Sequence, residues 1–156
     1  MKKFLLFVFT HLVAVGLGFA LGIYALPILI APAAPTAADV KQQVGQTAFT
    51  AQFKRDLPGS DALHWGEGTV SVGTQSIGLA GRLAPGPDYK LYLSPEFVET
   101  KGDFLRVKPQ MVLVGDVKTF ENFLVPLPAG LDPARYTTVV VWCESFNQFI
   151  TAARYR

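Results

Sequence analysis

Cys143, the single cysteine of the chain, offers the most distinctive chemistry in the sequence. It ends the run Thr137-Thr-Val-Val-Val-Trp-Cys143, which consists of β-branched, aromatic and sulfur residues. Such a run is typical of a buried strand, and side chains alternate along a strand. We therefore predict a central strand covered on both faces, with Cys143 and alternate valines on one face and Trp142 on the other.

Cys143 has several candidate roles. A reactive thiolate needs a nearby cation or a helix N-terminus to lower its pKa, and neither Trp142 nor Glu144 supplies one. A thiol on a valine-rich strand can simply pack as a small apolar residue. The alternatives are a thiolate ligand to a haem or metal and an intermolecular disulfide, because a lone cysteine cannot form an intramolecular disulfide.

Other side chains with catalytic or binding chemistry are few. His64 begins the segment His64-Trp-Gly-Glu-Gly68, and Asp88 and Glu144 are isolated carboxylates in the sequence. Motifs of the form GxSxG, GxxxxGK[ST] and HExxH are absent, which disfavours a hydrolase or an NTPase. We take Cys143, Trp142, Asp88 and His64 as the candidate site residues and predict no metal cluster built from side chains.

The charge of the chain disfavours nucleic acid as a partner. The net charge is +2, and Lys2 and Lys3 account for it, because the remaining residues carry 12 basic and 12 acidic side chains. A nucleic-acid-binding domain needs a basic face. The part of the chain beyond Lys3 is neutral overall, so we expect no such face.

Residues 4–31 contain no Asp, Glu, Lys or Arg. A helix needs about 20 residues to cross a bilayer, whereas a cleavable secretory signal has an apolar core of about 7–15 residues. Residues 1–31 are therefore predicted to be a transmembrane anchor or uncleaved signal. A cleavage site among Ala31-Pro32-Ala33-Ala34 is the alternative.

The position of Lys2 and Lys3 predicts the orientation of the anchor. Positively charged residues stay on the cytoplasmic side of a membrane. The C-terminal domain would then lie outside the cytoplasm, which in a bacterium means the periplasmic face of the inner membrane. The lipid bilayer is the expected partner of residues 4–31, and an envelope protein is a further expected partner.

The remaining sequence divides into a linker and an all-β domain. Residues 32–46 contain Pro32 and Pro35 and then Thr36-Ala-Ala-Asp39, which has the spacing of a capping box and predicts a short helix. Residues 47–156 show short apolar runs separated by Gly and Pro, which favours an antiparallel β-sandwich. The eight predicted strands are residues 47–54, 68–74, 77–83, 89–94, 111–118, 122–127, 137–144 and 146–152, with no helix between them.

Four segments of this domain resemble, in order, the motifs of the DM13 domain family. They are His64-x-Gly66-x-Gly68-Thr-Val, Gly86-Pro-Asp88-Tyr-Lys-Leu-Tyr-Leu93, Tyr136-x-x-Val-Val-Val-Trp-Cys143-x-x-Phe146 and Phe149-x-x-Ala152. The resemblance covers residues 49–154. It assigns the motif positions of the family to Gly86, Pro87, Asp88, Trp142 and Cys143.

The resemblance implies a β-sandwich that takes part in extracytoplasmic redox chemistry or electron transfer. It also implies that Cys143 acts as a thiol or as the ligand of a prosthetic group, for which a haem or a metal is the candidate. An alternative function is a non-enzymatic binding or assembly module of the cell envelope with a buried structural cysteine. Such a module would present the loops at residues 57–65 and 95–109 to a partner.

Overall fold

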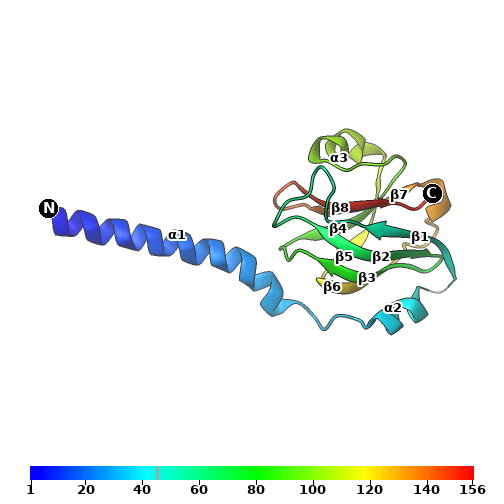
Figure 1. Ribbon diagram of the computed structural model, residues 1–156, viewed down its shortest axis with the longest axis horizontal. Coiled ribbons are helices and arrows are strands. Elements are labelled where there is room, and N and C mark those ends of the chain that lie inside the picture. The colour runs from blue at the N-terminus through cyan, green and yellow to red at the C-terminus, as the bar shows by residue number, and fades with distance from the viewer. Residues whose placement is uncertain (45) are drawn as a thin grey trace.

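The computed structural model describes residues 1–44 and 46–156 and contains two four-stranded antiparallel sheets that follow a long N-terminal helix (Figure 1). The predicted all-β sandwich of eight strands is confirmed. One sheet has the order β1-β2-β3-β6 and the other the order β5-β4-β7-β8. The strands are β1 (Thr47–Phe53), β2 (Gly66–Gly73), β3 (Ser76–Leu83), β4 (Tyr89–Ser94), β5 (Val112–Val117), β6 (Glu121–Pro126), β7 (Thr138–Cys143) and β8 (Gln148–Arg154).

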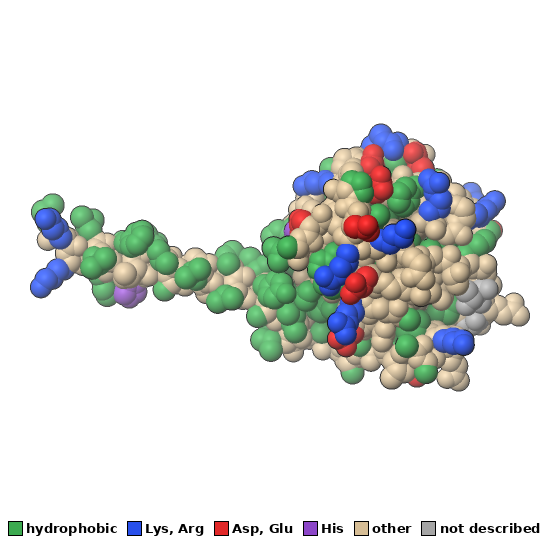
Figure 2. All heavy atoms as spheres, viewed as in Figure 1, with side chains coloured by type: hydrophobic (Ala, Val, Ile, Leu, Met, Phe, Trp, Pro, Cys, Tyr) green, Lys and Arg blue, Asp and Glu red, His purple; other side chains and the backbone are tan. Residues whose placement is uncertain are grey.

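Helix α1 (Lys2–Ile30) extends away from the sandwich and touches it only near its C-terminal end (Figure 1). The helix is long and apolar enough to cross a membrane. Hydrophobic side chains cover it and continue onto the adjoining part of the domain (Figure 2). His11 lies within this apolar helix, and its Nδ1 hydrogen-bonds to the carbonyl of Phe7 at 2.8 Å.

Helix α2 (Ala37–Gln43) confirms the short helix predicted after the anchor. Thr36 Oγ1 accepts a hydrogen bond from the Asp39 backbone N–H, and the Asp39 carboxylate accepts one from the Thr36 N–H, as in a capping box. Val40 is buried where α2 packs on β3 and β6. This close approach requires Gly78 in β3, because a Cβ there would lie 2.5 Å from Val40 Cγ1.

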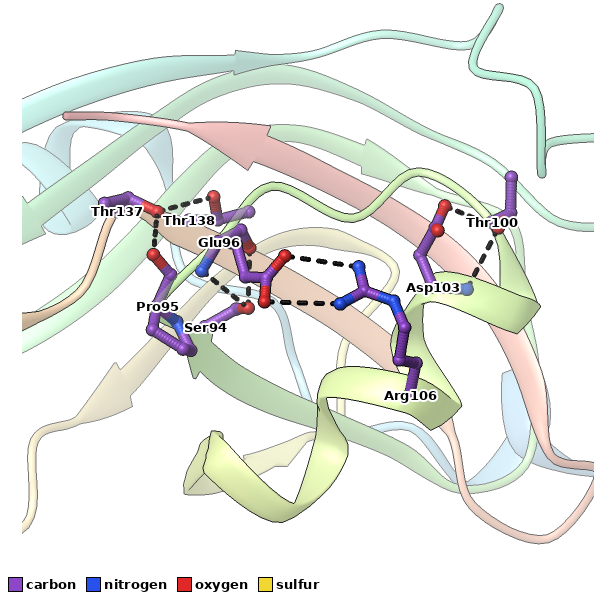
Figure 3. A network of polar contacts seen from close by, with 8 residues as sticks. All are labelled: Ser94, Pro95, Glu96, Thr100, Asp103, Arg106, Thr137 and Thr138. Atoms are coloured by element: carbon purple, nitrogen blue, oxygen red, sulfur yellow. Dashed lines mark hydrogen bonds and ion pairs between the residues drawn. The ribbon is translucent and has the colours of Figure 1, made fainter.

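The prediction that residues 95–109 form a loop is wrong. This segment contains helix α3 (Lys101–Val107) and the 3-10 turn η1 (Lys108–Gln110). Thr100 caps α3 by accepting a hydrogen bond from the Asp103 N–H at 3.1 Å, and Arg106 binds Glu96 at 3.2 Å (Figure 3). A helix of about two turns is too short to show a periodic pattern, and its stability comes mainly from packing.

The second sheet separates two hydrophobic clusters. One cluster lies between the two sheets, and the other lies between the second sheet and α3. All six residues of β7 are buried. The predicted coverage of this strand on both faces is therefore confirmed, and its two faces have different surroundings.

Candidate functional site

Cys143 is the last residue of β7, and its side chain belongs to the cluster between the sheets together with Val139 and Val141. Only 2% of the residue is exposed. On the neighbouring strand β4 its direct partner is Tyr89. The thiol therefore lies at the end of the core, beside the tyrosine that follows the Gly86-Pro87-Asp88 loop.

A mostly apolar cavity of about 310 Å³ adjoins this end of the core, and Cys143 is part of its wall. The wall is assembled from segments far apart in the sequence. They are α1, the loop between β1 and β2, the loop between β3 and β4, and the turn between β7 and β8. The residues that line it include Tyr24 of α1, His64, Gly86, Tyr89, Cys143 and Phe146.

Tyr89 is fixed beside the sulfur by its hydroxyl, which donates a hydrogen bond to the carbonyl of Ala84 at 2.8 Å. Burial, and to a smaller extent the nearby Cys143, raise the pKa of Tyr89 well above its ordinary value. Gly86 provides the space for the ring, because a Cβ at this position would lie 2.4 Å from the Tyr89 hydroxyl. This contact gives a physical reason for glycine in the Gly-Pro-Asp motif.

Asp88 ties the loop before β4 to the turn that follows Cys143. Its carbonyl accepts a hydrogen bond from the Glu144 N–H at 3.0 Å, and its carboxylate accepts one from the Ser145 hydroxyl at 2.8 Å. Lys90 forms an ion pair with the same carboxylate at 3.0 Å. Burial alone would raise the pKa of Asp88, but the hydrogen bonds from Lys90 and Ser145 outweigh it and lower the pKa. Asp88 therefore positions the turn that carries the thiol.

The surroundings of Cys143 favour the protonated thiol. Burial is the largest effect and raises its pKa, and the charge of Asp88 acts in the same direction. The backbone N–H groups of Phe146, Asp88 and Ser145 act against this shift but do not reverse it. The free thiol is thus a poor nucleophile, although the same N–H groups would stabilise a thiolate that forms when a ligand binds.

His64 lines the same cavity from the loop between β1 and β2. Its Nδ1 hydrogen-bonds to the Asp61 carboxylate at 2.8 and 2.9 Å, and the Leu63 N–H donates to the same carboxylate at 2.7 Å. The bond to His64 is the main cause that lowers the pKa of Asp61. Because Nδ1 is engaged, Nε2 is the ring nitrogen that remains able to bind a ligand.

Trp142 is separated from the cavity, since it projects from the opposite face of β7. Its indole stacks on Phe104 of α3, with ring centres 3.9 Å apart and planes 9° apart, and it is fully buried. Its Nε1 has no hydrogen-bond partner among the described atoms. The structure therefore places Cys143, His64 and Tyr89 around one cavity and Trp142 in another cluster.

Glu144 also points away from the thiol, toward the cluster around Trp142. Its carboxylate lies 2.7 Å from Lys108 Nζ and accepts a hydrogen bond from the Tyr92 hydroxyl. Burial alone would raise the pKa of Glu144, but the bonds from Lys108 and Tyr92 outweigh it and lower the pKa. Lys108 Nζ also lies 5.6 to 5.8 Å from the ring centres of Tyr92, Phe104 and Trp142, so the ion pair closes this aromatic cluster.

The donor atoms around the cavity suit a prosthetic group bound through one thiolate better than a metal ion held by several side chains. Among residues 1–44 and 46–156, no group of three or more His, Cys, Asp or Glu side chains is placed to hold a metal ion. A group bound through a single thiolate fits better, because Cys143 borders an apolar cavity and His64 lies in the same wall. Cys143 and His64 are therefore the residues that could hold a prosthetic group.

Of the candidate residues named from the sequence, Cys143 and His64 line the cavity, and Asp88 holds the turn beside it. Tyr89 follows Asp88 directly, and its burial could have been inferred from the alternation of β4. The contribution of α1 has no signal in the sequence, because Tyr24 and its neighbours resemble any apolar segment.

The family comparison concerns the β-sandwich that carries these residues. A family model described as "Electron transfer DM13" matches residues 52–155. The match begins within β1 and ends just after β8, so it covers nearly the whole sandwich and excludes α1 and α2. Comparisons with curated proteins and with solved structures found no match.

Proposed function

This chain belongs to the DM13 electron-transfer family, and from that premise we propose that it is a membrane-anchored electron-transfer module with Cys143 at its redox centre. The observation that carries the proposal is the position of the thiol. Cys143 is the single cysteine in the sequence, and it borders a cavity that the predicted anchor helps to enclose. A redox group at this position would lie close to the membrane.

The residues around the thiol have different roles in the proposed electron transfer. The valines of β7 and the ring of Tyr89 keep water from the sulfur, and Asp88 holds the turn that carries it. A bound metal-containing prosthetic group would supply reversible one-electron chemistry, and Cys143 would hold it as the thiolate. The N–H groups of Phe146 and Ser145 would then stabilise the thiolate.

The proposed location follows from α1 and its flanking charges. The helix is long and apolar enough to span a bilayer. Lys2 and Lys3 would keep its N-terminus in the cytoplasm. The sandwich would then lie on the periplasmic side of an inner membrane, where envelope proteins are available as electron donors or acceptors.

An absorption spectrum tests the role of Cys143. The full-length protein is purified from its native membrane, and its ultraviolet and visible spectrum is compared with that of Cys143→Ser. We expect a haem or charge-transfer band that shifts or disappears in the variant. The matched control is Thr74→Ala, which changes an exposed hydroxyl in the turn between β2 and β3, outside the cavity wall, and should leave the band in place. A featureless spectrum in all proteins would contradict ligation by Cys143.

The burial of the thiol favours one alternative, a non-enzymatic binding or assembly module with a structural cysteine. Cys143 is 2% exposed, and its pKa is raised. In that case Cys143→Ala would retain partner binding and all spectral properties. Recovery of one specific envelope protein by both the wild type and Cys143→Ala would support this alternative.

A further inference from the structure

Helix α1 contributes a defined face to the cavity at Cys143. Ala20, Ile23 and Tyr24 line it, and their i, i+3, i+4 spacing places them on one side of the helix. Pro27, one turn further along, is buried against the domain. The cavity therefore has one wall on the predicted membrane helix and the other walls on the sandwich.

We propose that this cavity binds the ring of a lipid-soluble quinone or hydroquinone that enters from the bilayer. The proposal deepens the proposed function, on which it rests, because it names a membrane-borne redox partner for the same site. The position of the cavity relative to the bilayer, its size and its polarity each favour the binding of such a ring.

The position of the cavity relative to the bilayer follows from the length of α1. At 1.5 Å per residue a helix of 29 residues is about 43 Å long, whereas the hydrocarbon core of a bilayer is about 30 Å thick. If about 20 residues after Lys3 span this core, Ile23 and Tyr24 lie at its outer boundary. Leu63 and Phe146, which are 59% and 53% exposed, project from the domain beside the same cavity. The cavity thus lies where a compound dissolved in the bilayer can reach it.

The size and polarity of the cavity favour a substituted ring over an acyl chain. A volume of about 310 Å³ is at the lower end of the range for small-molecule sites. The otherwise apolar wall includes three residues that carry polar groups, His64, Tyr24 and Cys143. A quinone ring carries oxygen atoms at opposite positions that can accept hydrogen bonds from such groups. An acyl chain would leave them without a partner, which is unfavourable.

The orientation of His64 supports this choice. Asp61 holds Nδ1 in a hydrogen bond at 2.8 Å, which fixes the ring and leaves Nε2 for the ligand. When Nδ1–H donates to a carboxylate, Nε2 of the neutral ring accepts a hydrogen bond from a hydroquinone hydroxyl, and Nε2–H of the imidazolium form donates one to a quinone oxygen. His64 is therefore the side chain assigned to the ring, while Ile23 and Phe146 would contact its apolar substituents.

Photolabelling of the full-length protein in phosphatidylcholine vesicles tests the proposal. The probe is an azido-substituted benzoquinone with a decyl tail, and labelled peptides are identified by mass spectrometry. We expect saturable labelling of peptides that contain residues 20–24 or 143–150, and competition by the unlabelled decyl quinone. Labelling spread evenly along α1, or labelling that does not saturate, would show partition into lipid and would overturn the proposal.

Two variants with matched controls locate the site. Ala20→Trp fills the cavity from the helix and should abolish the saturable labelling, whereas Leu21→Trp places the same side chain at a position that is 66% exposed and should not. His64→Phe keeps an aromatic ring but loses one hydrogen bond, so the apparent affinity should fall about tenfold. His11→Phe changes the other histidine, which lies outside the cavity, and should leave the affinity unchanged. Equal labelling in wild type, Ala20→Trp and His64→Phe would overturn the proposal.

The quinone site and the redox role of Cys143 can fail separately. If Cys143→Ser alters the native spectrum but the probe does not label the cavity, the quinone site is wrong and the proposed function stands. If the probe labels the cavity but the native spectrum is featureless, the site stands and the redox role of Cys143 is wrong. Release of the protein from membranes by alkaline carbonate would overturn the quinone site, because the cavity would not adjoin a bilayer.

Discussion

The two faces of β7 have different surroundings. On the face between the sheets, Val139 and Val141 pack in the core and the series ends at Cys143, whose thiol borders a cavity. On the other face, Val140 and Trp142 pack beneath α3, and Glu144 closes the cluster in an ion pair with Lys108. One face thus ends at an open cavity, and the other ends in a sealed aromatic cluster.

The difference shows that one strand can pack a sealed cluster on one face and border an open cavity on the other. A stacked pair such as Trp142 and Phe104 contributes large apolar burial and a further contribution of about 0.5–1.5 kcal/mol. Cys143 contributes a smaller side chain, and the space beside it is left unfilled. Substitutions on the two faces should therefore have very different effects on unfolding.

The largest expected effect is on the sealed face. Trp142→Ala should lower the free energy of unfolding by about 3–5 kcal/mol, because it leaves a cavity beneath α3. Denaturant titration of the full-length protein measures the loss. Trp65→Ala is the matched control and should cost clearly less, because Trp65 is only partly buried and is covered by Arg55 at 3.3 Å. Similar losses for the two tryptophans would contradict the contrast between the faces.

The second prediction concerns the reactivity of the thiol on the open face. Because burial raises the pKa of Cys143, less thiolate is present at mildly alkaline pH. Alkylation by iodoacetamide at about pH 8 should be at least about tenfold slower in the folded protein than in denaturant. Mass spectrometry of timed samples gives both rates.

A displaced cysteine provides the control for this measurement. In the double variant Cys143→Ala and Thr74→Cys, the thiol lies in the exposed turn between β2 and β3. Its alkylation rate should be nearly the same in the folded and unfolded states. If Cys143 in the wild type also reacted at the unfolded rate, the thiol would be accessible and its raised pKa would be wrong.

The third prediction concerns the ion pair that closes the aromatic cluster. Glu144→Gln should lower the free energy of unfolding by about 1 kcal/mol at neutral pH, since the pair is only partly shielded from water. The pKa of Glu144 is lowered in the folded protein, so its contribution is present above the unfolded value near 4.5 and is lost as the pH falls through the folded value.

Unfolding measurements at pH 7 and below pH 4 check this sign. The difference in stability between wild type and Glu144→Gln should shrink at the lower pH. Lys108→Met, which removes the other partner, should show the same trend. A difference that grows on acidification would mean that the carboxylate does not stabilise the folded state.

The smallest expected effect is at the rim of the cavity. Phe146→Ser should change the free energy of unfolding by less than about 0.5 kcal/mol, because the ring is 53% exposed. Thermal unfolding of the two proteins in the same detergent measures the change. A large loss of stability would mean that Phe146 belongs to the core, and the open face would then be more tightly packed than its exposure indicates.

Much of the fold could be predicted from local patterns. The alternation along residues 137–144 predicted which side chains of β7 share a face, and the structure confirms it. The capping box at Thr36 and Asp39 predicted α2, because the contacts that form it join residues only three positions apart. Helix α3 was missed because its stability depends on Phe104 meeting Trp142, which lies far away in the sequence.

The candidate site could be predicted only in part. Cys143 was found because its type is unique in the chain, and Asp88 because its motif resembles that of a family. Trp142 was taken as a site residue because it is part of the same family motif as Cys143, and the predicted alternation places its side chain on the opposite face of β7, beneath α3. Lys108, the ion-pair partner of Glu144, could not be identified, because nothing in the sequence relates the two positions.

The sequence by itself determined the apolar helix, the succession of strands and the single thiol at the end of β7, because each depends on composition or on neighbouring residues. Only the tertiary structure decided that α1, His64, Gly86 and Tyr89 meet around that thiol. Such a meeting depends on the packing of segments separated by many residues, and the strength and geometry of those contacts are properties of the folded chain.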